Sequence, residues 1–396
     1  VGHLQSVVDT PALRDAYNAA LPKVTELFIR LSQDEALFAK YRAIEASPEF
    51  AALSAVRQRI VKREIRDFVL SGAALPAEKR ERVMAIGQAL SQTSQKFSEN
   101  LLDATNAFEL VIDDKAKLAG IPEETLALYE ASAKAAGKSG WRITLQFPSY
   151  LPAMKYCEDR SIRETLYRAF STRAAEFDGA RFDNTPLMTE ILKLRGEEAS
   201  LLGFKNYAAL SLETKMAESP EAVLTFLRDL ARRAKPKAQA DVEEVNEFAR
   251  RELNLETVEP WDRPYASEKL RESRYSYSDA EVKRYFTEPT VFAGLFKLVE
   301  TLFGIEINEA KASVWHPDVK YFEVKRNGEK IAAFYADLYA REGKRSGAWM
   351  DGERTRTIRA GRLVTPVAYL VCNFAAPVAG KPATLTHDEV TTLFHE

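Results

Sequence analysis

The sequence predicts a mainly α-helical protein with a small mixed β-sheet near its C-terminal end. Apolar residues recur every three or four positions through residues 8–110 and again through 161–253, which is the spacing of helices that bury one face. After about residue 306 the pattern changes to short strand-like runs, two of them separated by the hairpin signal Asn327-Gly328. The last residues carry strong signals of a helix start.

The first hundred residues predict one helix after another. Pro11 suits the first turn of the first helix, and Ser71-Gly72 is a typical stop for the third. The longest stretch is rich in Glu, Lys, Gln and Ala, which favour helix by intrinsic propensity. We interpret the apolar stripes as helix packing and see no cofactor motif in them. The expected helices begin near residue 11 and then cover 33–44, 48–70 and 77–106.

The next segment predicts two strands, 107–112 and 141–145, because β-branched and aromatic residues cluster there. They are expected to pair across a helix at 122–136. Two prolines in 147–152 indicate a turn.

Helical spacing resumes in the middle of the chain. A loop is expected at 178–183, and the prolines within 255–266 indicate a connection. The helix expected at 219–253 carries a run of basic residues, which we interpret as a solvent-exposed face. These residues are Arg228, Arg232, Arg233, Lys235 and Lys237. The expected helices are 161–175, 185–202, 219–253, 281–286 and 291–303.

The C-terminal part predicts four strands followed by a helix. Strands at 319–325 and 330–339 are joined by the hairpin turn, and two more are expected at 345–350 and 364–374. The charged, glycine-bearing segment 351–362 predicts a loop.

The final helix begins with the spacing of a capping box. Thr386 and Glu389 can each satisfy a free backbone N–H of the first turn. An apolar stripe follows at Val390, Leu393 and Phe394, and the sequence then reads His395-Glu396. A helical His-Glu pair is how the zinc motif H-E-x-x-H begins, in which two His bind the metal and the Glu is the general base.

Composition narrows the functional class. At 396 residues, 46% of them hydrophobic and 29% charged, the chain is typical of a globular protein with more than one structural unit. A net charge of −2 gives no reason to expect a nucleic-acid or anionic-membrane partner, and no apolar run is long enough to span a bilayer. No signal peptide is visible at residues 1–5. Cys157 and Cys372 do not form a disulfide framework and are expected to be buried, which fits a reducing cytoplasm.

Several segments, in order along the chain, match one family pattern. They are Leu-Leu-Asp-Ala-Thr at 101–105, Trp-His-Pro-Asp-Val at 315–319, Asp-Leu-Tyr-Ala-Arg at 337–341, Gly-Ala-Trp-Met at 347–350, the strand-like run 366–374, and the final helix. On these segments the chain resembles the thimet-oligopeptidase family of zinc metallopeptidases, over essentially its whole length. Residues 338–341 and 386–389 resemble the oligopeptidase A branch more than the dipeptidyl carboxypeptidase branch.

The resemblance implies a zinc-dependent oligopeptidase that hydrolyses short peptides. It makes His395 the first zinc ligand and Glu396 the general base. It also implies that the remaining ligands follow residue 396, so the chain is a fragment ending inside the zinc motif and is expected to be inactive alone. The implied zincin-like fold has helices lining a deep channel. We expect a helical region with a β-insertion at 1–170, a helical channel wall at 171–305 and the front of the catalytic core at 306–396.

Extended peptides are often held as an added strand at a sheet edge. In zincins this edge is the strand before the one that leads to the zinc helix, which here is 345–350. Gly347 and Ala348 are small enough for a substrate backbone to approach, and Trp349 is placed to flank a side-chain pocket. The alternative is a bulge at Gly347 and Ala348 with Trp349 in the core.

The sequence also gives expectations for the other histidines and leaves alternative functions open. We expect His316 to be a hydrogen-bonded loop residue, and His3 and His387 to be ordinary surface residues. The protein is expected to be a cytoplasmic monomer with short peptides as partners. The alternatives are a non-catalytic helical scaffold or partner subunit, or a dipeptidyl carboxypeptidase.

Overall fold

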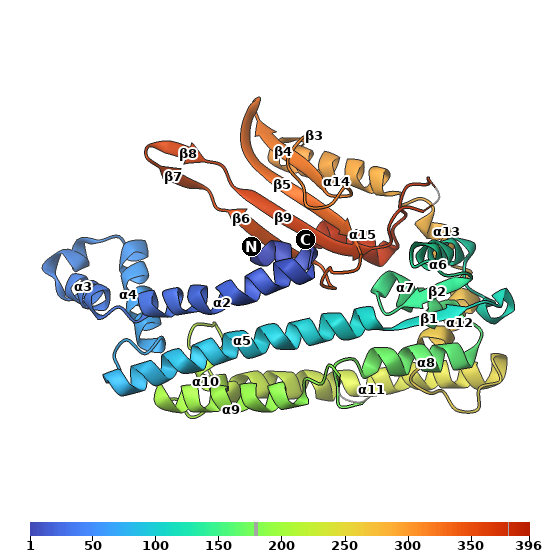
Figure 1. The fold of residues 1–396 in the computed structure, drawn as a ribbon, viewed down its shortest axis with the longest axis horizontal. Helices are drawn as coiled ribbons and strands as arrows, with labels where there is room; N and C mark the ends of the chain where they lie inside the picture. The colour runs from blue at the N-terminus through green and yellow to red at the C-terminus, as the bar shows by residue number, and fades with distance from the viewer. Residues whose placement is uncertain (178–180, 379) are drawn as a thin grey trace. The chain divides into compact units, whose positions relative to one another are not determined.

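The computed structural model describes residues 1–177, 181–378 and 380–396, and helices dominate it (Figure 1). Two compact units are each assembled from separated stretches. Unit 1 comprises Val1–Thr10, Leu102–Arg173 and Asp241–Glu396, and unit 2 comprises Pro11–Leu101 and Ala174–Ala240. The predicted class, mainly α with a small mixed sheet, is confirmed. These units are defined by contacts in space, and their segments alternate along the chain. The domain ranges 1–170, 171–305 and 306–396 stay a prediction.

The regular elements that the structure describes in unit 2 are all helices, as the sequence predicts. The predicted helix 48–70 is divided at Leu53, because the Ser54 hydroxyl accepts a hydrogen bond from the backbone N–H of Arg57 and caps a new helix. Residues 178–180 of the predicted loop lie outside the described residues. The elements are α2 Pro11–Ser32, α3 Glu35–Ala46, η1 Pro48–Ala52, α4 Ala55–Leu70, α9 Thr185–Leu201 and α10 Tyr207–Leu212, with parts of α5 Ala77–Ala107 and α11 Pro220–Glu252.

The first core of unit 1 forms around two paired strands. β1 (Glu109–Ile112) and β2 (Trp141–Thr144) are antiparallel, with α6 (Glu123–Ala135) between them in sequence, as predicted. The expected turn at 147–152 is wrong, because α7 (Phe147–Tyr156) begins there. Pro148 suits the first helical turn, and burial of Tyr150, Ala153 and Met154 outweighs the hydrogen bond that Pro152 cannot make.

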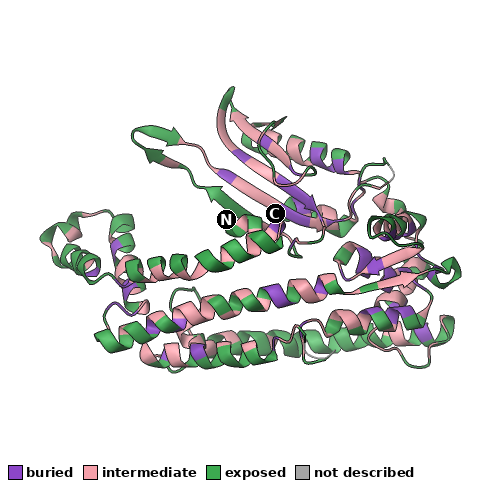
Figure 2. Ribbon diagram, in the orientation of Figure 1, coloured by how far each residue is buried: buried purple, intermediate pink, exposed green. Residues whose placement is uncertain are grey.

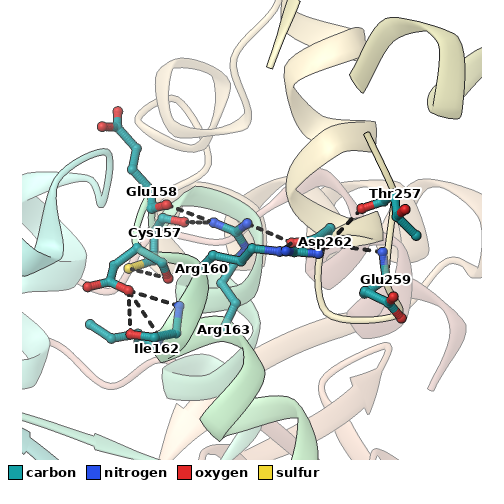
Figure 3. Close-up of polar contacts among 10 residues, drawn as sticks. Cys157, Glu158, Arg160, Ile162, Arg163, Thr257, Glu259 and Asp262 are labelled. Atoms are coloured by element: carbon teal, nitrogen blue, oxygen red, sulfur yellow. Dashed lines mark hydrogen bonds and ion pairs between the residues drawn. The ribbon is translucent and has the colours of Figure 1, made fainter. Parts of the chain in front are cut away.

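A buried ion pair fastens α8 (Arg160–Ser171) to the segment before α12 (Arg263–Tyr275) (Figure 3). The Arg163 guanidinium donates to Asp262 at 2.9 Å and to the Cys157 carbonyl at 2.7 Å, and Arg160 donates to Asp262 at 2.7 Å. Burial acts to raise the pKa of Asp262, but hydrogen bonds from the two arginines outweigh it and hold that pKa below its usual value. The expected connection at 255–266 ends earlier than predicted, because α12 already begins at Arg263. Pro264 is compatible with this start, since proline is tolerated in the first turn of a helix.

The second core of unit 1 is built on a five-stranded mixed sheet of order β3-β4-β5-β9-β6. Only β5 and β9 are parallel. The hairpin at Asn327-Gly328 is confirmed, with φ of +52° and +79°. The strands are β3 Glu306–Ala310, β4 Lys320–Arg326, β5 Glu329–Tyr339, β6 Trp349–Arg354 and β9 Val367–Phe374; β3 is absent from the predicted set.

The expected loop at 351–362 is wrong. β6 continues to Arg354, and a further hairpin follows from β7 (Thr357–Arg359) and β8 (Arg362–Val364). Its turn residues Ala360 and Gly361 both have positive φ. The hairpin is largely exposed (Figure 2), so its strands lack the apolar alternation that identifies a half-buried strand in sequence.

Helices cover both faces of the sheet. On one face, α14 (Glu288–Phe303) packs its aromatic side chains on β4 and β5, and α15 (His387–His395) contributes Leu393 to the same apolar cluster (Figure 1). On the other, α1 (Gly2–Val7) sets the His3 ring on Tyr369 of β9. In the described residues, no helix is both long enough and apolar enough to cross a membrane.

Candidate functional site

The helix that carries the predicted His-Glu pair is fixed at both its start and its buried face. The Thr386 hydroxyl accepts from the Glu389 N–H at 3.1 Å, and the Glu389 carboxylate accepts from the Thr386 N–H at 2.7 Å, which confirms the capping box. Leu393 is buried and Val390 packs beside it. Phe394 departs from the expected stripe: it is 43% exposed, because Leu393 already fills the position that faces the sheet.

His395 and Glu396 occupy the last turn of this helix. His395 is exposed and ends α15, and Glu396 is half-buried, with its backbone N–H bonded to the Thr392 carbonyl at 3.0 Å. Burial raises the pKa of the Cys372 thiol to about 12, and the Glu396 carboxylate adds to this shift. Cys372 lies in β9, the strand between β5 and the edge strand β6.

Gly347, Ala348 and Trp349 mark the start of the edge strand. The expected edge 345–350 is displaced: β6 begins at Trp349, which pairs with Val371 of β9, so Gly347 and Ala348 precede the strand. Gly347 has φ +101°, a conformation that residues with side chains rarely adopt. Ala348 packs in the apolar cluster that also holds Leu393. The start of β6 and the His-Glu helix thus share one core.

Asn373 holds the segment before β6 against β9. Its side-chain amide donates to the Arg345 carbonyl at 3.0 Å and to the Gly347 carbonyl at 2.6 Å. The Arg345 guanidinium lies 4.4 Å from the centre of the Trp349 ring, and the Arg345 N–H bonds the Ser6 carbonyl at 2.9 Å. Asn373 lay within the segment that matched the family pattern, but only the structure shows what it binds.

A buried charge network lies at the end of β5 and precedes this segment. The Asp337 carboxylate accepts from Arg341 at 2.6 Å, from Lys344 at 2.7 Å and from the Trp315 indole N–H at 2.8 Å. Burial acts to raise the pKa of Asp337, but the interactions with Arg341 and Lys344 outweigh it and hold that pKa below its usual value. Arg341 also donates to the Val7 carbonyl at 2.8 Å. The network therefore ties the N-terminal segment to the chain that leads into β6.

The other histidines divide into two kinds. His316 accepts a hydrogen bond from the Asp318 N–H at 3.3 Å, which confirms a hydrogen-bonded loop residue, and His387 is exposed as expected. His3 is not an ordinary surface residue. Its ring stacks on Tyr369 at 3.5 Å and meets Trp315 edge-on, and neither buried nitrogen finds a hydrogen-bond partner among the described residues. Burial lowers the pKa of His3 to about 4, against the opposing effect of Asp337.

No three His, Cys, Asp or Glu side chains gather to hold a metal ion within residues 1–177, 181–378 and 380–396. His395 offers one nitrogen ligand, whereas zinc sites in enzymes use three protein ligands. The described residues therefore do not compose a zinc site by themselves. Cys157 and Cys372 are free and buried, as predicted, and do not take part in one.

Comparison with known proteins gives a consistent result. Residues 153–396 match the family described as Peptidase family M3, and residues 1–80 match the Neurolysin/Thimet oligopeptidase N-terminal domain. Oligopeptidase A of Salmonella typhimurium is 46% identical over all of this chain, and the chain covers 59% of that relative. The organellar oligopeptidase A of Arabidopsis thaliana is 41% identical over all of this chain and 52% of its own length. Dipeptidyl carboxypeptidase of Escherichia coli is 34% identical over 91% of this chain and 53% of its own length. The chain thus spans little more than half the length of these relatives.

Proposed function

Since the chain belongs to peptidase family M3, we propose that it forms part of a zinc-dependent oligopeptidase that hydrolyses short peptides. The observation that carries this proposal is the arrangement in unit 1. An edge strand, the neighbouring β9 and a capped helix bearing His395-Glu396 share one apolar cluster. In this arrangement His395 serves as one metal ligand, and further ligands come from outside the described residues.

Glu396 is proposed as the general base. It lies on the same helical turn as His395, so a carboxylate stands next to the metal ligand, where it can accept a proton from an attacking water molecule. The N-terminal capping box and the burial of Leu393 hold the helix rigidly against the sheet, which limits the movement of this side chain.

β6 is proposed as the strand that aligns the peptide. It lies at the end of the sheet order, bonded to β9 on one side and to no other strand among the described residues. A peptide can use its free edge as an added strand. Gly347 has open space around it, Ala348 has a small side chain, and Trp349 offers an aromatic surface. Asn373 fixes the start of this segment through the Gly347 carbonyl.

An oligopeptidase A type of activity is favoured over that of a dipeptidyl carboxypeptidase by the higher identity of those relatives, 46% against 34%. We further propose a cytoplasmic, monomeric enzyme; the name of one relative, probable cytosolic oligopeptidase A of Arabidopsis thaliana, supports the location.

The test uses the full-length protein that contains this chain, with zinc content and cleavage of a quenched fluorescent peptide as separate readouts. Glu396→Gln should keep its zinc and lose turnover by about 100-fold or more, because an amide cannot accept the proton. His395→Ala should lose both zinc and turnover, and His387→Ala should keep both. Near-normal kcat in Glu396→Gln would show that the assigned role is wrong. A full-length protein without peptidase activity would instead favour the scaffold.

A further inference from the structure

A basic hollow lies on the surface of unit 2, between α4 and the loop that joins α10 to α11. It is open to solvent and has a volume of about 430 Å³. One wall carries Arg59, Lys62, Arg63 and Arg66 of α4, and the other carries Thr214, Lys215 and Met216. None of these residues takes part in the peptidase site proposed above.

The sequence of α4 places its cations on one side. Positions 59, 62, 63 and 66 follow the i, i+3, i+4, i+7 spacing that puts side chains on one face of a helix. Val61 and Phe68 are buried on another face, where Phe68 packs against Phe38 of α3. Because this packing fixes the rotation of α4, the cationic face is held toward the hollow.

The positive charge of the hollow is poorly neutralised. Arg66 pairs with Asp67 at 2.7 Å, and Asp67 is itself half exposed. Arg59, Lys62 and Arg63 make no ion pair with any part of the chain that the structure describes. Lys215 donates to the Ser211 hydroxyl at 2.6 Å, which brings no negative charge. Like charges one helical turn apart destabilise a helix, so the cluster is unfavourable until an anion occupies it.

We propose that the basic hollow binds a small anion that carries several phosphate groups. Its volume lies within the usual range for small-molecule sites. The guanidinium fork of arginine matches phosphate oxygens with two parallel hydrogen bonds, and lysine adds a point charge. Cations stand on both walls, so a ligand that bridges them needs more than one phosphate group. The shared chemistry is an oligophosphate chain, either free or carried by a nucleotide.

The test measures binding to this chain by isothermal titration calorimetry, with inorganic tripolyphosphate as the probe, and does not depend on peptidase activity. Arg63→Glu should weaken binding by about tenfold or more at low salt, since it replaces a phosphate contact with a like charge. Arg57→Glu is the matched control: it makes the same charge change on the same helix but lies outside the hollow, and it should stay within about twofold. Lys215→Gln removes charge from the opposite wall and should also weaken binding.

Two further probes identify the ligand class. Adenosine triphosphate tests whether a nucleotide binds more tightly than the phosphate chain alone, and hexaglutamate supplies comparable negative charge without phosphate. Binding of either phosphate compound that is lost in Arg63→Glu and kept in Arg57→Glu supports the proposal. Equal losses in the two variants, no detectable tripolyphosphate binding, or tighter binding of hexaglutamate would overturn it. If circular dichroism shows that Arg63→Glu is unfolded, Arg63→Gln takes its place, with Arg57→Gln as its control.

Discussion

Replacing Asp337 with asparagine is expected to destabilise unit 1 by about 4 kcal/mol. The substitution keeps the size of the side chain and removes only its charge. Asp337 is 1% exposed, and it accepts hydrogen bonds from Arg341, Lys344 and Trp315. The Lys344 side chain is fully buried, so it has no access to water when its carboxylate partner is lost.

The magnitude follows from what the substitution leaves behind. Removing one partner of a buried ion pair typically costs about 3–5 kcal/mol, because the other charge stays buried without compensation. Arg341 is 15% exposed and can recover part of its solvation, and Lys344 keeps its bonds to the Asp337 and Tyr339 carbonyls. These two effects keep the expected loss near the middle of that range.

The measurement is urea unfolding followed by the fluorescence of the four tryptophans, one of which is Trp315 beside Asp337. Asp351→Asn is the control, since it removes an exposed carboxylate and should change the free energy of unfolding by less than about 0.5 kcal/mol. The dependence on pH gives a second check. The folded-state pKa of Asp337 lies below its ordinary value of 3.8, so its stabilisation is present above about pH 4 and is lost as pH falls through the folded-state pKa. Asp337→Asn should therefore lose less stability in acid than the native chain.

The double variant with Lys344→Met separates this explanation from simple loss of packing. With the buried cation also removed, the double variant should be more stable than the sum of the single variants by about 1–3 kcal/mol. A loss below about 1 kcal/mol in Asp337→Asn, or strictly additive losses, would refute the argument that Asp337 compensates a buried charge.

Three further predictions concern the proposed function. The 396-residue chain should retain no stoichiometric zinc after dialysis, because His395 is a single ligand; zinc that depends on His395 in a metal analysis would contradict this. In the full-length enzyme, Ala348→Val should lower kcat/KM while costing less than about 1.5 kcal/mol of stability. If that variant instead unfolds and its folded fraction binds peptide normally, Ala348 is only structural. Asn373→Ala should raise KM more than it lowers kcat and should speed amide hydrogen exchange around Gly347, since it releases two backbone carbonyls; unchanged exchange at Gly347 would show that Asn373 does not fix this segment.

Local chemistry was enough to identify much of this protein. The helices of unit 2, the hairpin at Asn327-Gly328 and the capping box of α15 depend on residues only a few positions apart, and periodicity, turn preference and capping act at that range. The ordered family segments also identified the His395-Glu396 helix and its place after the sheet. Local rules failed where burial or long-range pairing opposed them: Pro148 and Pro152 indicate a turn, yet the apolar core keeps α7 helical, and the exposed hairpin β7–β8 has no apolar pattern to detect.

Tertiary structure decided the contacts that join distant parts of the chain. His3 meets Tyr369, the Ser6 carbonyl bonds Arg345, and Lys344 turns back to Asp337 as a buried partner. No spacing in the sequence reveals such pairs, because the side chains come together only when strands and helices pack. The same holds for the basic hollow, where the face of α4 is readable from its spacing but the opposing wall with Lys215 is not. Sequence determined which elements form, and packing determined which of their side chains meet, because burial of distant apolar surfaces sets the position of every element.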